Sequence, residues 1–132
     1  MCNICNNKYN IEQKILNIEN CNIIINIPKE LIHLEKIKIY KCKNIKEIPK
    51  ELNKLEEIHI VQCDNFCKLY NTFTKLNKLY ICYYNKVSHI PDNYINLNDI
   101  VIDFHREDKQ TLYCITTDKQ QIQDYIRFLN KL

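Results

Sequence analysis

The chain has 132 residues, of which 45% are hydrophobic and 27% charged, and a net charge of +3 at pH 7. This length suits one domain with a sizeable core, and the composition argues against wholesale disorder. Lys and Glu alternate instead of forming a basic cluster, which argues against nucleic-acid binding. The sequence contains no Gly, so backbone corners with positive φ are expected at Asn and Asp.

The N-terminal stretch MCNICNNKYNIEQ lacks the apolar segment of a secretory signal, and no stretch is apolar for long enough to span a membrane. We therefore expect the eight cysteines to be reduced thiols in a cytoplasmic protein. Cys2 and Cys5 form a C-x-x-C, which is half of a zinc knuckle, and Cys21 is the nearest additional thiol. Because no second C-x-x-C follows at finger spacing, the sequence predicts no metal and no cofactor.

From Leu16 onward the sequence repeats every 21 residues. The unit reads L-x-x-I-x-I-x-x-C-x-x-I-x-x-I-P-x-x-L-x-x. Alternation within the unit predicts short strands whose every second residue is buried, and the constant step places these strands side by side and parallel. The clearest columns are Leu34, Leu55, Leu76 and Leu97; Leu16, Ile37, Ile58, Leu79 and Ile100; and Ile24, Ile45, Phe66 and Val87.

This unit resembles the leucine-rich repeat, L-x-x-L-x-L-x-x-N/C-x-L, in its intracellular Cys/I-x-x-I-P variant, over roughly residues 16 to 105. The resemblance implies an α/β fold, a leucine-rich repeat solenoid, with a curved parallel sheet of about five strands. Short helical turns, each begun by the Pro of the unit, should lie on the convex side. Cys21, Cys42 and Cys63 occupy the Asn/Cys column and are interpreted as structural, since parallel thiols do not converge on an ion.

We expect a single domain, with an N-terminal cap at residues 1–15, repeats at 16–105 and a C-terminal cap at 106–132. Residues 1–8 are expected to be loose. TLYCIT follows the last repeat too closely for a parallel crossover, so it predicts an antiparallel hairpin through HREDKQ. TTDKQQIQDYIRFLNKL predicts a capping helix over residues 118–131, which begins with a capping box of Thr117 and Gln120.

The outward positions of the strands form further columns. Lys36, Glu57, Lys78 and Asp99 alternate in sign and predict a stabilising ladder. Tyr buries a large area at low entropic cost, so Tyr80 and Tyr83 are the predicted anchors for a partner, which the lysines suggest is acidic. The alternative is that the aromatic rings only cover one another and that this face of the sheet binds no partner. The predicted partner-binding residues are Lys38, Tyr40, His59, Tyr80, Tyr83, Val101 and Phe104.

The sequence thus predicts a monomeric, non-catalytic module that binds a partner protein, and neither nucleic acid nor membrane. The alternatives are a substrate-recognition adaptor of a larger assembly such as a ubiquitin ligase, and a structural component of a virus particle. An enzyme would require Cys82, His59 and Asp103, all expected on the exposed face, to work as nucleophile, base and carboxylate. His59 and Cys82 are expected to be too far apart for that role, so no catalytic residue is predicted.

Overall fold

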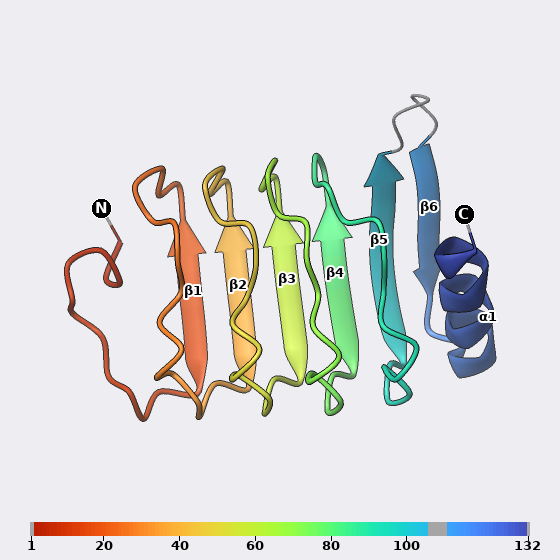
Figure 1. Cartoon of the computed structure of the whole chain (residues 1–132), viewed down its shortest axis with the longest axis horizontal. Helices are drawn as coiled ribbons and strands as arrows, with labels where there is room; N and C mark the ends of the chain where they lie inside the picture. Colours follow the sequence, from red (N-terminus) through yellow and green to blue (C-terminus); the bar gives the residue numbers. More distant parts are fainter. Residues whose placement is uncertain (1, 106–110, 132) are drawn as a thin grey trace.

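The computed structural model describes residues 2–105 and 111–131, and it shows one six-stranded sheet with the strands in sequence order (Figure 1). The predicted connection HREDKQ falls mostly on residues 106–110, outside the described residues. The strands are β1 (Ile15–Glu19), β2 (Lys36–Tyr40), β3 (Glu57–Val61), β4 (Lys78–Cys82), β5 (Asp99–His105) and β6 (Thr111–Thr116), and they are followed by the helix α1 (Lys119–Asn130).

Strands β1 to β5 pair in parallel with a register of 21 residues. Leu16 lies opposite Ile37, and Ile37 lies opposite Ile58, with the same step continuing to β5. Inward-facing side chains therefore stack in rows, and the Leu34, Leu55, Leu76 and Leu97 column is fully buried. This pairing confirms the predicted parallel-strand solenoid with 21-residue turns. Each unit of the solenoid buries its apolar stripes only against its neighbours.

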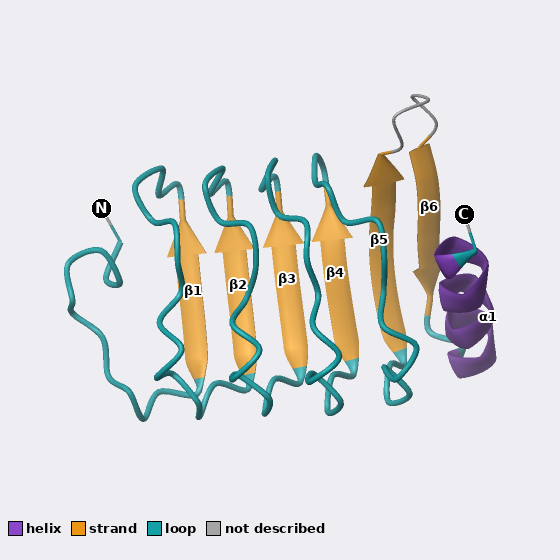
Figure 2. Cartoon of the chain, viewed as in Figure 1, coloured by secondary structure: helices purple, strands orange, loops and turns teal. Residues whose placement is uncertain are grey.

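The return segments run across one face of the sheet and leave the other face open (Figure 2). Each Pro motif closes a single hydrogen-bonded turn, as in Leu31 N–H to Pro28 O and Leu52 N–H to Pro49 O. Within the described part of the chain these turns do not extend into an α-helix on this side. The turns supply the second buried stripe of the solenoid, since Leu31 and Leu52 are fully buried.

Positive φ angles recur at the ends of strands β1 to β4 and do not follow residue type. Asn20 fits the expectation of Asn or Asp, but Lys41, Gln62 and Tyr83, one repeat apart, also have φ between 53° and 56°. The expectation was therefore wrong for most of these corners. The repeat geometry sets the conformation, because the N–H at each of the first three corners donates to the last carbonyl of the next strand.

Polar side chains also tie neighbouring repeats together on the return side. Each of these side chains donates to a backbone carbonyl 22 residues earlier, as in Asn65 to Lys43 (2.7 Å) and Thr72 to Lys50 (2.7 Å). Asn44, Asn93 and Asn96 do the same. These bonds satisfy carbonyls that the irregular return segments leave without a ladder partner.

The Cys column changes at the fourth repeat. Tyr84 and Tyr83 both have positive φ, and the inward position passes to Asn85, one residue later than the repeat predicts. Buried Asn85 donates from Nδ2 to the Asp103 carbonyl (2.9 Å) and accepts the Val87 N–H (3.0 Å). An amide thus supplies loop hydrogen bonds in place of the thiol of the earlier repeats.

The C-terminal hairpin and helix confirm the predicted cap. Strand β6 pairs antiparallel with β5, and α1 buries Ile122, Ile126 and Leu129. The capping residue is Asp118, whose side chain accepts the Gln121 N–H (2.8 Å), so the predicted capping box at Thr117 was wrong by one position. Aspartate at this position also suits the positive end of the helix dipole.

Candidate binding face and N-terminal thiol cluster

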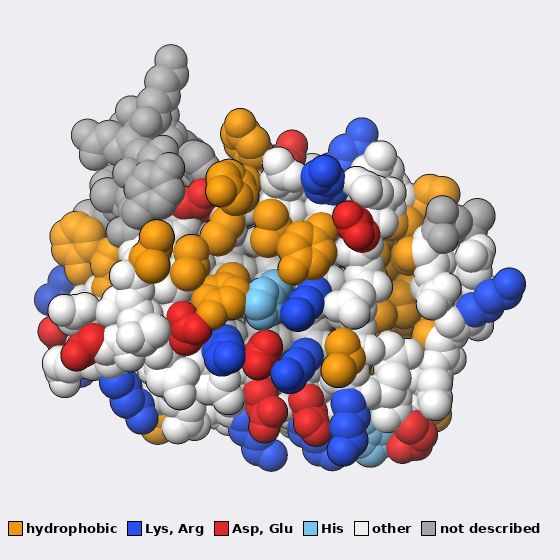
Figure 3. All heavy atoms as spheres, turned by 180° about the vertical axis from the view of Figure 1, so that it is seen from behind, with side chains coloured by type: hydrophobic (Ala, Val, Ile, Leu, Met, Phe, Trp, Pro, Cys, Tyr) orange, Lys and Arg blue, Asp and Glu red, His pale blue; other side chains and the backbone are white. Residues whose placement is uncertain are grey.

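The open face of the sheet carries a band of charged side chains beside a group of apolar and aromatic ones (Figure 3). Outward residues of β2 to β4 are half-buried, because neighbouring side chains on adjacent strands cover one another. The apolar group, which we call the sheet-face patch, consists of Tyr40, Val61, Tyr80, Cys82, Val101 and Ile115, with Tyr83 at its margin. Contiguous apolar surface of this kind commonly marks an interaction site.

The charged band is the predicted ladder. Glu57 Oε1 lies 3.5 Å from Lys36 Nζ and 3.8 Å from Lys78 Nζ. Burial raises the pKa of Glu57, but the two lysines and His59 outweigh burial and hold the pKa below its usual value. Opposite charges on adjacent strands therefore stabilise the sheet and occupy its polar margin.

Tyr80 is held in place from two sides. Its hydroxyl donates to Asp99 on β5, and its ring packs edge-on against His59 on β3, with the centroids 4.5 Å apart. The hydrogen bond to Asp99, together with burial, raises the pKa of Tyr80 to about 12. A ring fixed in this way loses little further entropy on binding a partner.

His59 makes stability depend on pH. Burial lowers its pKa below 6.5, although nearby Glu57 acts in the opposite direction. Below about pH 6.5 the unfolded chain takes up a proton that folded His59 does not, so the free energy of unfolding should fall as the pH drops. Urea unfolding between pH 7.5 and 5 should show this slope, and His59→Gln should flatten it.

Exposed His89 provides the control for this pH series. His89→Gln should keep the slope of the native chain. The assignment to His59 is refuted if His59→Gln and His89→Gln show the same dependence on pH.

The structure places the predicted partner-binding residues in two rows and at one corner. Lys38, His59, Tyr80 and Val101 lie opposite one another in register, and Tyr40 belongs to the next row. Tyr83 follows β4, with 61% of its surface exposed. Phe104 lies in β5, but its side chain is outside the described residues.

Ile115 is a patch residue that the sequence prediction missed. It pairs with Val101 across the β5–β6 hairpin and is 73% exposed. The 21-residue step cannot locate it, because β6 runs antiparallel and follows a different register. The alternation in TLYCIT is the one signal for it, since buried Cys114 and exposed Ile115 are adjacent.

Asp103 was expected on the exposed face, and this was wrong. It is 5% exposed, and its carboxylate accepts the Tyr83 N–H (2.8 Å) and Asn85 Nδ2 (3.2 Å). The Cys82 thiol is directed instead to the Val101 carbonyl (3.9 Å), and burial raises its pKa. Asp103 therefore stabilises the backbone at the end of β4, and its charge adds to the effect of burial on the pKa of Cys82.

The buried thiols of the Cys column have different surroundings. Cys42 Sγ donates to the Tyr40 carbonyl (3.3 Å), and Cys63 Sγ lies 3.5 Å from the Val61 carbonyl. Burial raises the pKa of both thiols, that of Cys42 to about 11. These two thiols are structural, as predicted.

Cys21 differs from the later members of its column. Its sulfur lies 3.5 Å from Cys5 Sγ, which in turn lies 3.5 Å from Cys2 Sγ. Burial opposes its ionisation, but backbone N–H groups of Cys2, Ile24 and Ile23 outweigh burial and lower its pKa to about 6. We call Cys2, Cys5 and Cys21 the N-terminal thiol cluster.

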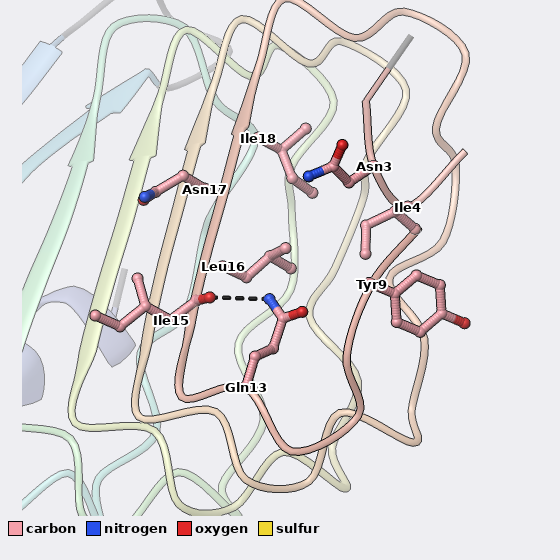
Figure 4. A pocket seen from close by; sticks show the side chains of 8 residues that line it. All are labelled: Asn3, Ile4, Tyr9, Gln13, Ile15, Leu16, Asn17 and Ile18. Carbon is pink, nitrogen blue, oxygen red and sulfur yellow. Dashed lines mark hydrogen bonds between the residues drawn. The ribbon is translucent and has the colours of Figure 1, made fainter. Parts of the chain in front are cut away.

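The N-terminal segment forms the first layer of the stack and is not loose as expected. Residues 2–8 make a series of turns, with Asn6 N–H bonded to Cys2 O and Lys8 N–H bonded to Asn3 O. Ile4 is buried against the end of the core. In Figure 4, Ile4, Leu16 and Ile18 point into a cleft of about 220 Å³ beside β1, and Ile15 and Asn17 point away from it.

Comparisons with protein-family models, with curated proteins and with solved structures find no match. In the described part of the chain, no helix is both long and apolar enough to cross a membrane.

Proposed function

We propose that the chain is a leucine-rich repeat protein of the intracellular type that binds a partner protein through the open face of its sheet. The partner offers apolar groups to the sheet-face patch and acidic groups to the lysines beside it. The interaction is non-catalytic. The eight free thiols support an intracellular setting.

The observation that carries this proposal is the contrast between the two faces of one sheet. One face is buried under the return segments, whereas the other leaves a contiguous set of apolar side chains half-buried or exposed. Tyr80 is fixed by Asp99 and His59, and Tyr83 stands at a corner whose backbone is fixed by Asp103. Preorganised aromatic anchors are typical of protein-binding surfaces.

Lysine side chains border the patch on the β2 side and along the charged ladder, and they indicate the charge of the partner. Lys38 lies in the same register row as His59 and Tyr80, and Lys41 follows Tyr40 at the end of β2. The charged ladder flanks this region with Lys36 and Lys78. An acidic rim on the partner would speed association and set its orientation.

The test is the double variant Tyr80→Ala with Tyr83→Ala. A partner isolated from the native cell should bind the purified native chain, and the double variant should bind it at least about 30-fold more weakly, since two anchor side chains are lost. Isothermal titration calorimetry measures the change. Circular dichroism should be unchanged, because the buried rows of the core are not altered.

Two further variants make the test specific. Tyr80→Phe removes only the hydroxyl bond to Asp99 and should retain most of the affinity. Phe128→Ala removes an exposed ring from α1, away from the sheet-face patch, and should bind as the native chain does. Equal binding by the double variant and by Phe128→Ala would show that the binding face lies elsewhere.

A further inference from the structure

The N-terminal thiol cluster has the dimensions of a metal site. Its sulfur atoms all lie within 4.8 Å of one another, and two of the separations are 3.5 Å. Sulfurs bound to one tetrahedral Zn²⁺ at 2.3 Å are about 3.8 Å apart. A single ion can therefore reach all three sulfurs with little movement, whereas a disulfide would need one pair to approach to about 2.05 Å.

The surroundings of Cys21 differ from those of the later cysteines in its column. The Cys21 sulfur lies 3.5 Å from a second thiol, Cys5 Sγ, while Cys42, one repeat later, donates its proton to the Tyr40 carbonyl. The two residues occupy the same column of the repeat, so the difference arises from the N-terminal segment. Metal binding to these thiols would release their protons, as it does at other cysteine sites.

The position of the cluster suggests what an ion would do for the fold. A solenoid exposes apolar surface at its ends and needs a cap there. Ile4 is buried in the core, with Cys2 and Cys5 packed against it, so the first residues cover the outer side of the first repeat. Buried Ile4 joins them to the core, and three metal–sulfur bonds would fasten them further.

We propose that Cys2, Cys5 and Cys21 bind one thiophilic divalent ion of the Zn²⁺ class, which fixes the N-terminal cap to the first repeat. Softer thiolate ligands select Zn²⁺ over Mg²⁺ or Ca²⁺. Among residues 2–105 and 111–131 no carboxylate or imidazole joins the three sulfurs, so the fourth position is taken by solvent.

The test uses the full reduced chain, handled without oxygen and titrated with Co²⁺ as a spectroscopic stand-in for Zn²⁺. We expect one equivalent to give sulfur-to-cobalt charge-transfer absorption and the visible bands of a tetrahedral site. Zn²⁺ should displace the cobalt and raise the Tm, because an ion that binds only the folded chain stabilises it.

Cys5→Ser is the principal variant, since Cys5 is only partly buried and its loss should leave the fold intact. It should weaken Co²⁺ binding at least about 100-fold, because loss even of an outer-shell partner costs 10- to 100-fold. Cys21→Ser should do the same. Cys67→Ser removes an exposed thiol outside the cluster and should bind within about twofold of the native chain.

Three outcomes would overturn the proposal. The first is a reduced native chain that shows no charge-transfer band at stoichiometric Co²⁺. The second is a band of equal strength in Cys5→Ser and Cys67→Ser. The third is binding of Cu⁺ without binding of Co²⁺ or Zn²⁺, which would assign the cluster to a monovalent ion.

Discussion

Replacement of Phe66 by Ala should lower the free energy of unfolding by about 3–5 kcal/mol, which is a large part of the total for a domain of this size. Phe66 is fully buried and belongs to the column that contains Ile45 and Val87 in the adjacent repeats. Each repeat of a solenoid contacts only its neighbours, so distant side chains cannot move in to fill the cavity.

The backbone around Phe66 lets this experiment isolate the side chain. Its N–H bonds to the Cys63 carbonyl (3.0 Å) and its carbonyl accepts the Lys86 N–H (2.8 Å), and both bonds are available to Ala. Phe66→Leu, which retains most of the volume, should cost less than about 1.5 kcal/mol. Guanidinium unfolding curves should show stability decreasing from the native chain to Phe66→Leu and then to Phe66→Ala.

Phe128→Ala provides the matched control, because the same atoms are removed from a side chain that is 51% exposed on α1. We expect a change within about 0.5 kcal/mol. In Phe66→Ala, hydrogen exchange should show lower protection of the backbone amides of β3 and β4, on either side of the cavity. A Phe66→Ala variant as stable as Phe128→Ala would contradict the view that the stacked repeats share one buried core around Phe66.

The fold could be predicted from the sequence because its rule is periodic. Leu34 and Leu55 differ by 21 residues, and so do the buried positions around them, so a single step fixes strand pairing and burial together. Where the chain leaves this rule, the prediction becomes weaker. Ile115 was missed because the hairpin sets its register, and Thr117 was chosen as the cap although Asp118, one residue later, makes the bond.

Conformation at the strand ends was mispredicted for a physical reason. Residue preference alone favours Asn at positive φ, but the hydrogen bonds between repeats are sufficient to hold Lys41 and Gln62 there. The thiol cluster was partly visible in the sequence, since C-x-x-C marks Cys2 and Cys5 and Cys21 is the nearest additional thiol, but no metal was predicted because a second C-x-x-C is absent. Cys2 lies close to one repeat length before Cys21, which is the signal that could have revealed the contact.

The second large effect should come from Asp103. Asp103→Ala removes the acceptor of the Tyr83 N–H and one acceptor of Asn85 Nδ2, and both Asp103 and Asn85 are buried. A buried donor left without a partner costs about 1–3 kcal/mol, and Asn85 Nδ2 keeps its bond to the backbone carbonyl of residue 103, so the free energy of unfolding should fall by about 1–3 kcal/mol. Chemical denaturation measures this, with exposed Asp64→Ala as a control that should change stability by less than about 0.5 kcal/mol.

A double-mutant cycle with Asn85→Ala tests whether these two residues act together. Asn85 bonds both the carboxylate and the carbonyl of Asp103, so the two losses should be non-additive by about 0.5–3 kcal/mol. Additive losses, or an Asp103→Ala variant as stable as Asp64→Ala, would show that the carboxylate does not organise this corner. Since Asp103 holds the backbone of Tyr83, faster amide exchange at Tyr83 in Asp103→Ala should accompany the loss of stability and link this buried group to the proposed binding face.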